Sequence, residues 1–184
     1  MDHQGRRDHL IQILQGAYSG ELAAGFAYRG HWKSVKNPQE RAAIQKIERE
    51  EWVHRARVGE MLAGLGSAPQ KLREVKLWVI GRTIGFACHM IGWFLPMYFA
   101  GRLESGNVVE YEVAASHAAA LGLKEFEAGL LEMAGVEKEH ELFFSSVIAG
   151  HRLLPVISAV FGWGKTADAE LSATSKNASH EAAD

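Results

Sequence analysis

Two glutamate–histidine pairs with the same spacing carry the most informative chemistry in this sequence. They are Glu51-Trp-Val-His54 and Glu137-Lys-Glu-His140. On an α-helix, positions i and i+3 share a face, so each pair would present a carboxylate and an imidazole side by side. Carboxylate oxygens and imidazole nitrogens together suit iron(II) or manganese. Chance alone supplies about one such pair in a chain of this composition. The flanking residues must therefore decide whether these two pairs are functional.

The residues around both pairs form the apolar stripes of two long predicted helices. Charged groups are rare in such a stripe unless they are paired or bind metal. Apolar residues lie above and below each polar pair: Ile44, Ile47, Val58 and Met61 flank the first, and Leu130, Met133, Phe144 and Val147 flank the second. The sequence therefore predicts that both pairs face the interior of a helical bundle at one level.

A single glutamate lies on the corresponding stripe of the helix that precedes each pair. Glu21 precedes Glu51 by 30 residues with a predicted turn at about residue 36, so an antiparallel hairpin would bring the two level. In the second hairpin, which turns near residue 122, we favour Glu110, although it is staggered by nearly one helical turn from its partner. Glu104 and Glu112 remain candidates for this position.

These residues together match a known type of metal centre. One glutamate from each of two helices, with a Glu-x-x-His pair from each of two others, is the ligand set of di-iron and di-manganese carboxylate bundles. Four carboxylates balance the charge of two divalent cations, so a buried cluster would be neutral. Cys88 is the only cysteine of the chain, so no thiolate site competes. The alternative is that the pairs form ion pairs on helix surfaces and never meet.

The distribution of apolar residues predicts an all-α fold. They recur at spacings of three, four and seven between only four prolines. The predicted helices cover about residues 6–33, 37–65, 76–100, 103–121, 123–147 and 150–162. We expect residues 1–163 to form a four-helix bundle with additional apolar helices, and the small, polar residues 164–184 to form a disordered tail.

The composition excludes several functional classes. Twenty Lys and Arg against 22 Asp and Glu give a net charge of −2 without a basic block, so we expect no nucleic-acid partner. The first residues lack the apolar run of a secretory signal and a lone cysteine forms no internal disulfide, so we expect a cytoplasmic protein. The absence of a GxGxxG motif, a phosphate loop or a nucleophile elbow argues against nucleotide cofactors and serine hydrolase chemistry.

The stretch Thr83–Gly101 contains 19 residues without Asp, Glu, Lys or Arg. It is long enough to be considered as a membrane span. His89, Pro96 and several glycines weaken that interpretation, and a span would also separate the two halves of the predicted site. We expect instead a helix that is buried in the domain or lies against a membrane surface.

The order of these residues resembles the ferritin-like demethoxyubiquinone hydroxylase family over about residues 10–160. The residues that carry the resemblance are Ser19-Gly20-Glu21 with Tyr28 seven residues later, Glu51-x-x-His54, Val109-Glu110 with His117 seven residues later, Glu137-x-x-His140, and Pro69 with Leu77-Trp78 in the connecting segment. The resemblance implies a ferritin-like bundle. It also implies a set of metal ligands, with Glu51 and Glu137 bridging: Glu21, Glu51, His54, Glu110, Glu137 and His140.

Two features depart from the family pattern. The family usually has a tyrosine where His117 stands, and a longer stretch than the 27 residues here between its last ligand glutamates. These departures affect what the resemblance implies about the substrate more than what it implies about the metal.

The resemblance implies a di-iron monooxygenase of ubiquinone biosynthesis, with manganese as the alternative metal. Such an enzyme uses O2 and an electron donor to hydroxylate a quinone-like or other lipophilic aromatic substrate. Tyr28 and His117 would orient the substrate or relay electrons and protons, unless they are simply buried residues satisfied by neighbouring carboxylates. Apolar residues 83–101 and 153–163 would provide a route for a lipophilic substrate. Peripheral contact with the inner face of the cell membrane and a homo-oligomer are compatible with this interpretation.

Three other functions use the same architecture. A ferroxidase or iron-storage subunit binds the same metals but needs an acidic outer surface, which the uncharged stretch does not provide. A peroxide-reducing bundle usually works with a cysteine-ligated iron centre, which one cysteine cannot build. A non-enzymatic helical partner protein would bind no metal and would tolerate Glu51→Ala.

Overall fold

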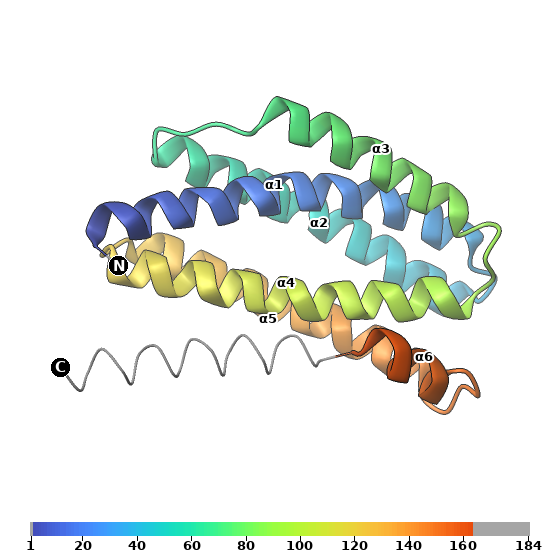
Figure 1. The fold of residues 1–184 in the computed structure, drawn as a ribbon. Helices are drawn as coiled ribbons and strands as arrows, with labels where there is room; N and C mark the ends of the chain where they lie inside the picture. Colours follow the sequence, from blue (N-terminus) through green and yellow to red (C-terminus); the bar gives the residue numbers. More distant parts are fainter. Residues whose placement is uncertain (1, 164–184) are drawn as a thin grey trace.

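The computed structural model describes residues 2–163, which form six α-helices (Figure 1). The helices are α1 (His3–Ser34), α2 (Pro38–Gly64), α3 (Lys71–Ala87), α4 (Phe94–Ala120), α5 (Lys124–Ile148) and α6 (Leu154–Phe161). The predicted all-α fold is confirmed for this part of the chain. The predicted polar tail, residues 164–184, lies outside the described residues.

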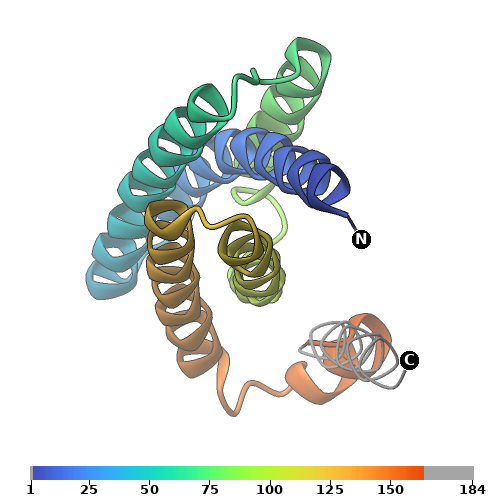
Figure 2. The same ribbon diagram turned by 90° about the vertical axis from the view of Figure 1, so that its left-hand side faces the viewer.

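Four long helices surround the core. α1 and α2 form one hairpin, α4 and α5 form another, and the hairpins meet where α1 contacts α4 and α2 contacts α5. Seen end-on, α3 lies outside the four-helix core and packs along α1, and α6 also lies outside this core, on the side of α4 and α5 (Figure 2). The end of α6 is held near α4, because Arg102 Nε donates hydrogen bonds to the carbonyl oxygens of Phe161 and Gly162.

Local sequence features define the ends of these helices. The Asp2 carboxylate caps α1 by accepting a hydrogen bond from the Gly5 amide at 2.7 Å. Asn37 caps α2, and Pro38 occupies the first turn, where a missing amide hydrogen costs nothing. The turn between α4 and α5 contains Gly122 in the left-handed region, with φ at +72°. These short turns keep the paired helices antiparallel.

The core consists of two apolar clusters, one in each half of the bundle. The first includes Leu10, Leu14, Val58, Leu62 and Leu130. The second includes Ile44, Ile47, Met97, Phe144 and Ile148. All four long helices contribute to the two clusters, so the residues between the clusters face the same interior. The polar side chains described below occupy this middle layer.

Glycines bring α3 close to α1. A Cβ atom added at Gly81 would lie 2.4 Å from the carbonyl oxygen of Ala23, and one added at Gly30 would lie 2.2 Å from the carbonyl oxygen of Gly85. Both distances are shorter than a Cβ tolerates, and the obstructing atoms belong to the backbone. Only glycine therefore permits this separation between the two helices.

One predicted helix boundary is wrong. The sequence predicts a helix over residues 76–100 and another over 103–121, whereas α3 ends at Ala87 and α4 begins at Phe94. The chain turns between them, where Gly92 has φ at +83°. Pro96 then lies in the first turn of α4, where proline is tolerated, so it begins a helix instead of interrupting one.

The same turn divides the uncharged stretch Thr83–Gly101 between two helices. Among the residues described, no helix is both long and apolar enough to cross a membrane. The expectation of a single apolar helix over this stretch is therefore replaced by the end of α3, a turn and the start of α4.

Candidate metal centre

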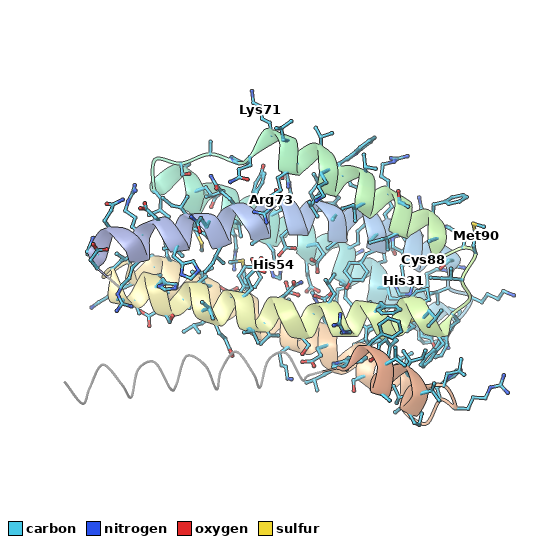
Figure 3. All side chains as sticks on the ribbon, viewed as in Figure 1. His31, His54, Lys71, Arg73, Cys88 and Met90 are labelled. Atoms are coloured by element: carbon cyan, nitrogen blue, oxygen red, sulfur yellow. The ribbon has the colours of Figure 1, made fainter. Side chains whose placement is uncertain are left out.

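Six buried acidic and histidine side chains form a polar layer between the two apolar clusters. Each is at most 3% exposed, and together they come from all four helices of the core. They are Glu21 on α1, Glu51 and His54 on α2, Glu104 on α4, and Glu137 and His140 on α5. Figure 3 shows His54 in the interior, between α1 and α4.

The layer contains two overlapping groups of four possible ligands. One group is Glu21, Glu51, His54 and Glu137, and the other is Glu51, Glu104, Glu137 and His140. Within each group, the candidate ligand atoms lie within 4.8 Å of one another. Glu51 and Glu137 belong to both groups, which is where bridging carboxylates of a two-metal centre would lie.

Both histidines direct Nδ1 toward the carboxylates. His54 Nδ1 lies 2.8 Å from Glu137 Oε1. His140 Nδ1 lies 3.4 Å from one oxygen of Glu51 and 3.4 Å from one of Glu137. The i, i+3 spacing of each pair places its carboxylate and imidazole on the same inward face, as the sequence predicts.

Several buried polar atoms of this layer have no hydrogen-bond partner among the described residues. They are both carboxylate oxygens of Glu51, Oε2 of Glu21, Oε2 of Glu137 and Nδ1 of His140. A buried carboxylate without a partner is costly, and unpartnered groups are rare in folded proteins. Because these atoms converge and offer oxygen and nitrogen donors, the donor set fits two divalent cations.

The acidic side chains of the layer have strongly shifted pKa values. Burial, reinforced by the neighbouring carboxylates, raises the pKa of Glu51 and of Glu104 well above the usual range. Burial also raises the pKa of Glu21. Burial acts in the same direction on Glu137, but the imidazoles of His140 and His54 outweigh it and hold its pKa below the usual range. Without metal, the glutamates with raised pKa values therefore hold protons, and these protons neutralise part of the negative charge of the layer.

The charge on His54 follows the same logic. Burial acts to lower its pKa, but the hydrogen bond to Glu137 and the charge of Glu21 outweigh burial, so the pKa of His54 is raised. A raised pKa favours the protonated imidazole, which pairs with the carboxylates. Metal binding to Nδ1 of His54 would displace the proton that this nitrogen carries.

Two tyrosines hold the glutamates from the opposite hairpin. The Tyr28 hydroxyl of α1 donates a hydrogen bond to Oε1 of Glu104, and the Tyr111 hydroxyl of α4 donates one to Oε1 of Glu21. Burial and the neighbouring carboxylates raise the pKa of both phenols well above the usual range, so they remain neutral donors. Tyr111 is absent from the residues predicted from the sequence.

Other polar side chains orient the clustered groups from outside. His140 Nε2 lies 3.0 Å from Glu50 Oε2, and Lys46 Nζ lies 2.7 Å from the other oxygen of Glu50. This contact favours a hydrogen on Nε2, which leaves Nδ1 of His140 as the candidate ligand atom. Asn107 Nδ2 donates to Glu104 Oε2 at 3.0 Å. Glu50 directly precedes Glu51 in the chain, and no feature of the sequence pattern predicted this contact.

Glu110, the residue preferred from the sequence, does not lie in the cluster. It is exposed and lines an apolar cavity, as described below, whereas Glu104 is fully buried among the other five side chains. Six residues separate the two, which corresponds to about 9 Å along α4 and a different helix face. Glu112, the other alternative, is also exposed. Glu104 therefore takes the position considered for Glu110.

His117 is also remote from the cluster. It lies 13 residues after Glu104 on α4, and its ring is 4.7 Å from that of His9. Its predicted role beside the metals is therefore not supported by its position. Once Glu104 replaces Glu110, the residue seven positions later is Tyr111, just as Tyr28 follows Glu21. The stretch from Glu104 to Glu137 is 33 residues, against 27 from Glu110.

A cavity of about 520 Å³ lies between α1, α3 and α4 and reaches this layer. Glu21, Tyr28 and Tyr111 belong to its wall. Most of the remaining wall is aliphatic or aromatic and includes Leu77, Ile80, Ile84, Ile91, Leu95 and Phe99. The candidate metal centre is therefore adjacent to a space suited to an apolar molecule of moderate size.

Comparison with known proteins finds relatives over part of the chain. No family model and no solved structure matches it. Over 82 residues, the chain is 32% identical to the 3-demethoxyubiquinol 3-hydroxylase of Francisella tularensis subsp. novicida strain U112, and equally to that of subsp. tularensis strain WY96-3418. The match covers 43% of this chain and 39% of each relative. The chain is thus distantly related to 3-demethoxyubiquinol 3-hydroxylases over this segment.

Proposed function

We propose that this chain is a ferritin-like di-iron monooxygenase that hydroxylates a quinol-like or other lipophilic aromatic substrate. The observation that carries the proposal is the pair of overlapping ligand groups, which share Glu51 and Glu137. The unpartnered carboxylate oxygens of these two residues support it. So does the partial similarity to 3-demethoxyubiquinol 3-hydroxylases, whose name describes hydroxylation of a quinol.

The charge of the layer favours two divalent cations. Four buried carboxylates carry four negative charges when ionised, and two divalent cations neutralise them. Without metal, the raised pKa values of Glu51 and Glu104 keep protons in the layer. Iron uptake would displace these protons, so we expect the affinity for iron(II) to rise with pH.

Bound iron would supply the activation of dioxygen. The protein's own groups hold the ligands in place: Tyr28 and Tyr111 fix the carboxylates of Glu104 and Glu21, and Glu50 fixes the ring of His140. Such contacts orient the side chains that would hold the metals and prevent them from rotating. Tyr28 and Tyr111 also lie on the cavity wall together with Glu21, so the substrate space would adjoin the metal layer.

The cavity favours the hydroxylase over an iron-handling protein. A ferroxidase or storage site must admit hydrated iron ions, which a wall of aliphatic and aromatic side chains disfavours. The same wall suits a lipophilic ring. A peroxide-reducing bundle would have no use for a space of about 520 Å³ with such walls.

We further propose that the outer surface of α3 lies on an anionic membrane, from which the substrate enters. Large apolar side chains are exposed along it, including Leu72, Val75 and Phe86 at 89%, 63% and 67%. Four exposed basic residues accompany them: Lys71, Arg73, Lys76 and Arg82. The one acidic residue of the helix, Glu74, is paired with Arg55. Exposed apolar residues beside basic ones are typical of helices that lie on anionic lipid surfaces.

The first experiment measures iron per chain after anaerobic loading, in the wild type, Glu104→Gln and Glu110→Gln. Both substitutions remove one carboxylate from α4, so they form a matched pair. We expect two irons in the wild type and in Glu110→Gln, and a sharp loss in Glu104→Gln. Glu137→Ala, which removes a shared ligand, is expected to lose both irons.

The second stage distinguishes hydroxylation from iron handling. Iron-loaded protein is given a short-chain quinol, O2 and a reductant, and the hydroxylated product is measured by mass spectrometry. Product formation that Glu104→Gln abolishes supports the hydroxylase. A folded wild-type chain that binds no iron would contradict the metal centre, and rapid iron(II) oxidation without any product would favour a ferroxidase.

A further inference from the structure

Asn107 of α4 lies at the boundary between the cavity and the metal layer. It belongs to the cavity wall, and so do Leu103, one helical turn before it, and Tyr111, one turn after it. Residues four positions apart share a helix face, so the Asn107 side chain leaves α4 on the face that borders the cavity. The residue is half-buried, and its amide reaches back to Glu104. Asn107 therefore connects the cavity wall with a candidate metal ligand.

The contact with Glu104 orients the Asn107 amide. Nδ2 of Asn107 donates a hydrogen bond to Oε2 of Glu104 at 3.0 Å, and the Tyr28 hydroxyl donates one to Oε1 of the same carboxylate. An ionised carboxylate only accepts hydrogen bonds, so the amide must present its NH2 group to Glu104. The carbonyl oxygen Oδ1, on the other side of the amide carbon, is therefore turned away from Glu104.

Oδ1 of Asn107 is an accessible hydrogen-bond acceptor. It accepts no hydrogen bond from residues 2–163, and it is not among the enclosed polar atoms, in contrast to both carboxylate oxygens of Glu51. The cavity wall around Asn107 is mostly aliphatic and aromatic, so polar atoms that a ligand can reach are few. A ligand that displaces water from such an atom must replace the lost hydrogen bond, or its affinity falls.

We propose that Oδ1 of Asn107 accepts a hydrogen bond from a ring hydroxyl of the aromatic substrate, so that the cavity selects phenols and quinols over quinones and methyl ethers of the same shape. An amide oxygen accepts but does not donate. The oxygen of a quinone or an ether, placed against Oδ1, would bring two acceptors together without a hydrogen between them, which costs affinity. The catalytic purpose of this selection rests on the proposed function, whereas the binding step requires no metal.

The test compares two probes that differ by one methyl group, 2-naphthol and 2-methoxynaphthalene. Both have an oxygen that accepts, but only the naphthol, which is uncharged near neutral pH, has a hydrogen to donate. Binding of each probe to the metal-free full chain is measured by equilibrium dialysis for the wild type and Asn107→Leu. Leucine has nearly the shape of asparagine and lacks the acceptor. Asn107→Ala serves as a second variant if Asn107→Leu does not fold.

Two control variants separate Oδ1 from its surroundings. Glu110→Leu makes the same replacement one turn further along α4, and it removes the other acceptor side chain of this part of the cavity wall. Tyr28→Phe removes the second donor to Glu104 and leaves Asn107 in place. It therefore reports whether a disturbed Glu104 alone changes the binding of the probes.

We expect Asn107→Leu to weaken binding of 2-naphthol about three- to tenfold and to leave binding of 2-methoxynaphthalene unchanged. Glu110→Leu and Tyr28→Phe should both keep the preference for the naphthol. Equal weakening of both probes by Asn107→Leu would mean that Asn107 only packs, and would overturn the inference. So would a wild type that binds the ether as tightly as the naphthol or binds neither, or a control variant that loses the preference to the same extent.

The outcome is independent of the metal centre. A chain that prefers the naphthol through Asn107 but takes up no iron would keep this inference and contradict the hydroxylase. A chain that takes up iron but whose Asn107→Leu variant keeps the preference for the naphthol would contradict this inference alone.

Discussion

Tyr28 and Tyr111 are related by the repeated pattern of the two hairpins. Each follows the glutamate of its own helix by seven residues, and each donates its hydroxyl hydrogen to the glutamate of the other hairpin. The crossed contacts join α1 to α4 through the polar layer. At the residue scale, the two phenols therefore support the carboxylates as well as border the cavity.

Replacing Tyr111 with phenylalanine should destabilise the protein. The variant leaves a buried oxygen of Glu21 without its donor, which costs about 1–3 kcal/mol of unfolding free energy. Tyr98→Phe is the matched control, because Tyr98 is equally buried and its hydroxyl has no hydrogen-bond partner among the described residues. Urea unfolding of metal-free protein should show a loss for Tyr111→Phe and little change for Tyr98→Phe. Equal effects would contradict a structural role of the Tyr111 hydroxyl.

Glu104 should make the stability of the metal-free protein depend on pH. Its pKa in the folded state is raised by burial, so the folded protein binds a proton that the unfolded chain releases above its ordinary pKa near 4.5. The stabilisation is complete below that value and is lost as pH rises toward the folded pKa. Glutamine imitates the protonated carboxyl group and does not titrate.

We therefore expect Glu104→Gln to match the wild type near pH 5 and to be more stable than the wild type near pH 8. Urea unfolding in the presence of a chelator would measure both differences. If the variant loses as much stability between these pH values as the wild type, Glu104 does not hold a proton in the folded state.

At the scale of elements, the packing of α3 on α1 defines one wall of the cavity. Gly81 and Gly85 are the buried residues of α3, and both face the backbone of α1. The backbone contact brings Leu77, Ile80 and Ile84 of α3 over the cavity. The remaining large apolar residues of α3 are exposed, so this contact carries most of its attachment to the bundle.

Gly81→Ala should weaken that attachment. The added Cβ would lie 2.4 Å from the Ala23 carbonyl oxygen, so one backbone must move, at a cost of about 1–3 kcal/mol. Gly135→Ala on α5 is the control, because no atom lies within 4 Å of its added Cβ and alanine favours an exposed helix by about 0.5–1 kcal/mol. Thermal unfolding should therefore show opposite shifts for the two variants. A stabilised Gly81→Ala would contradict the close helix contact.

At the scale of the whole molecule, the chain presents an apolar and basic surface on the side that also closes the cavity. Figure 3 shows Lys71 on α3 directed away from the bundle, and Met90 at the outer end of the α3–α4 turn. Met90 is 72% exposed, which continues the apolar surface of α3 into this turn. A lipophilic substrate that leaves a membrane at this surface would have to cross only α3 and its turn to reach the cavity.

Substituting Val75 and Phe86 of α3 with glutamate should reduce binding to anionic phospholipid vesicles, since each change removes apolar contact and adds negative charge. Leu131→Glu on α5 is the control, because Leu131 is also exposed, at 50%, but lies on another helix. Vesicle co-sedimentation should show a loss of at least several-fold for the double variant and none for Leu131→Glu. Equal binding of all three proteins, or no binding of the wild type, would contradict the proposed membrane surface.

The helical content and the inward direction of the Glu-x-x-His pairs were predictable from the sequence, because helical periodicity is a local property. Glu51, His54, Glu137 and His140 lie on regular apolar stripes, and the short turn near residue 36 brings Glu21 level with Glu51. The predicted helix ends near residues 100 and 103 were wrong, because a proline in a first turn and a glycine in a loop leave the same pattern as an interrupted helix.

The choice between Glu104 and Glu110 was decided only by the tertiary structure. Apolar residues lie on nearly every side of α4, so periodicity does not distinguish the face that turns inward. That face depends on how α4 packs against α1 and α5, which brings together residues far apart in the chain. The crossed tyrosine contacts, the Glu50–His140 contact and the cavity at Asn107 have the same origin. The sequence determines which residues share one face of a helix. Only the packing of the helices determines which residues of other helices that face contacts.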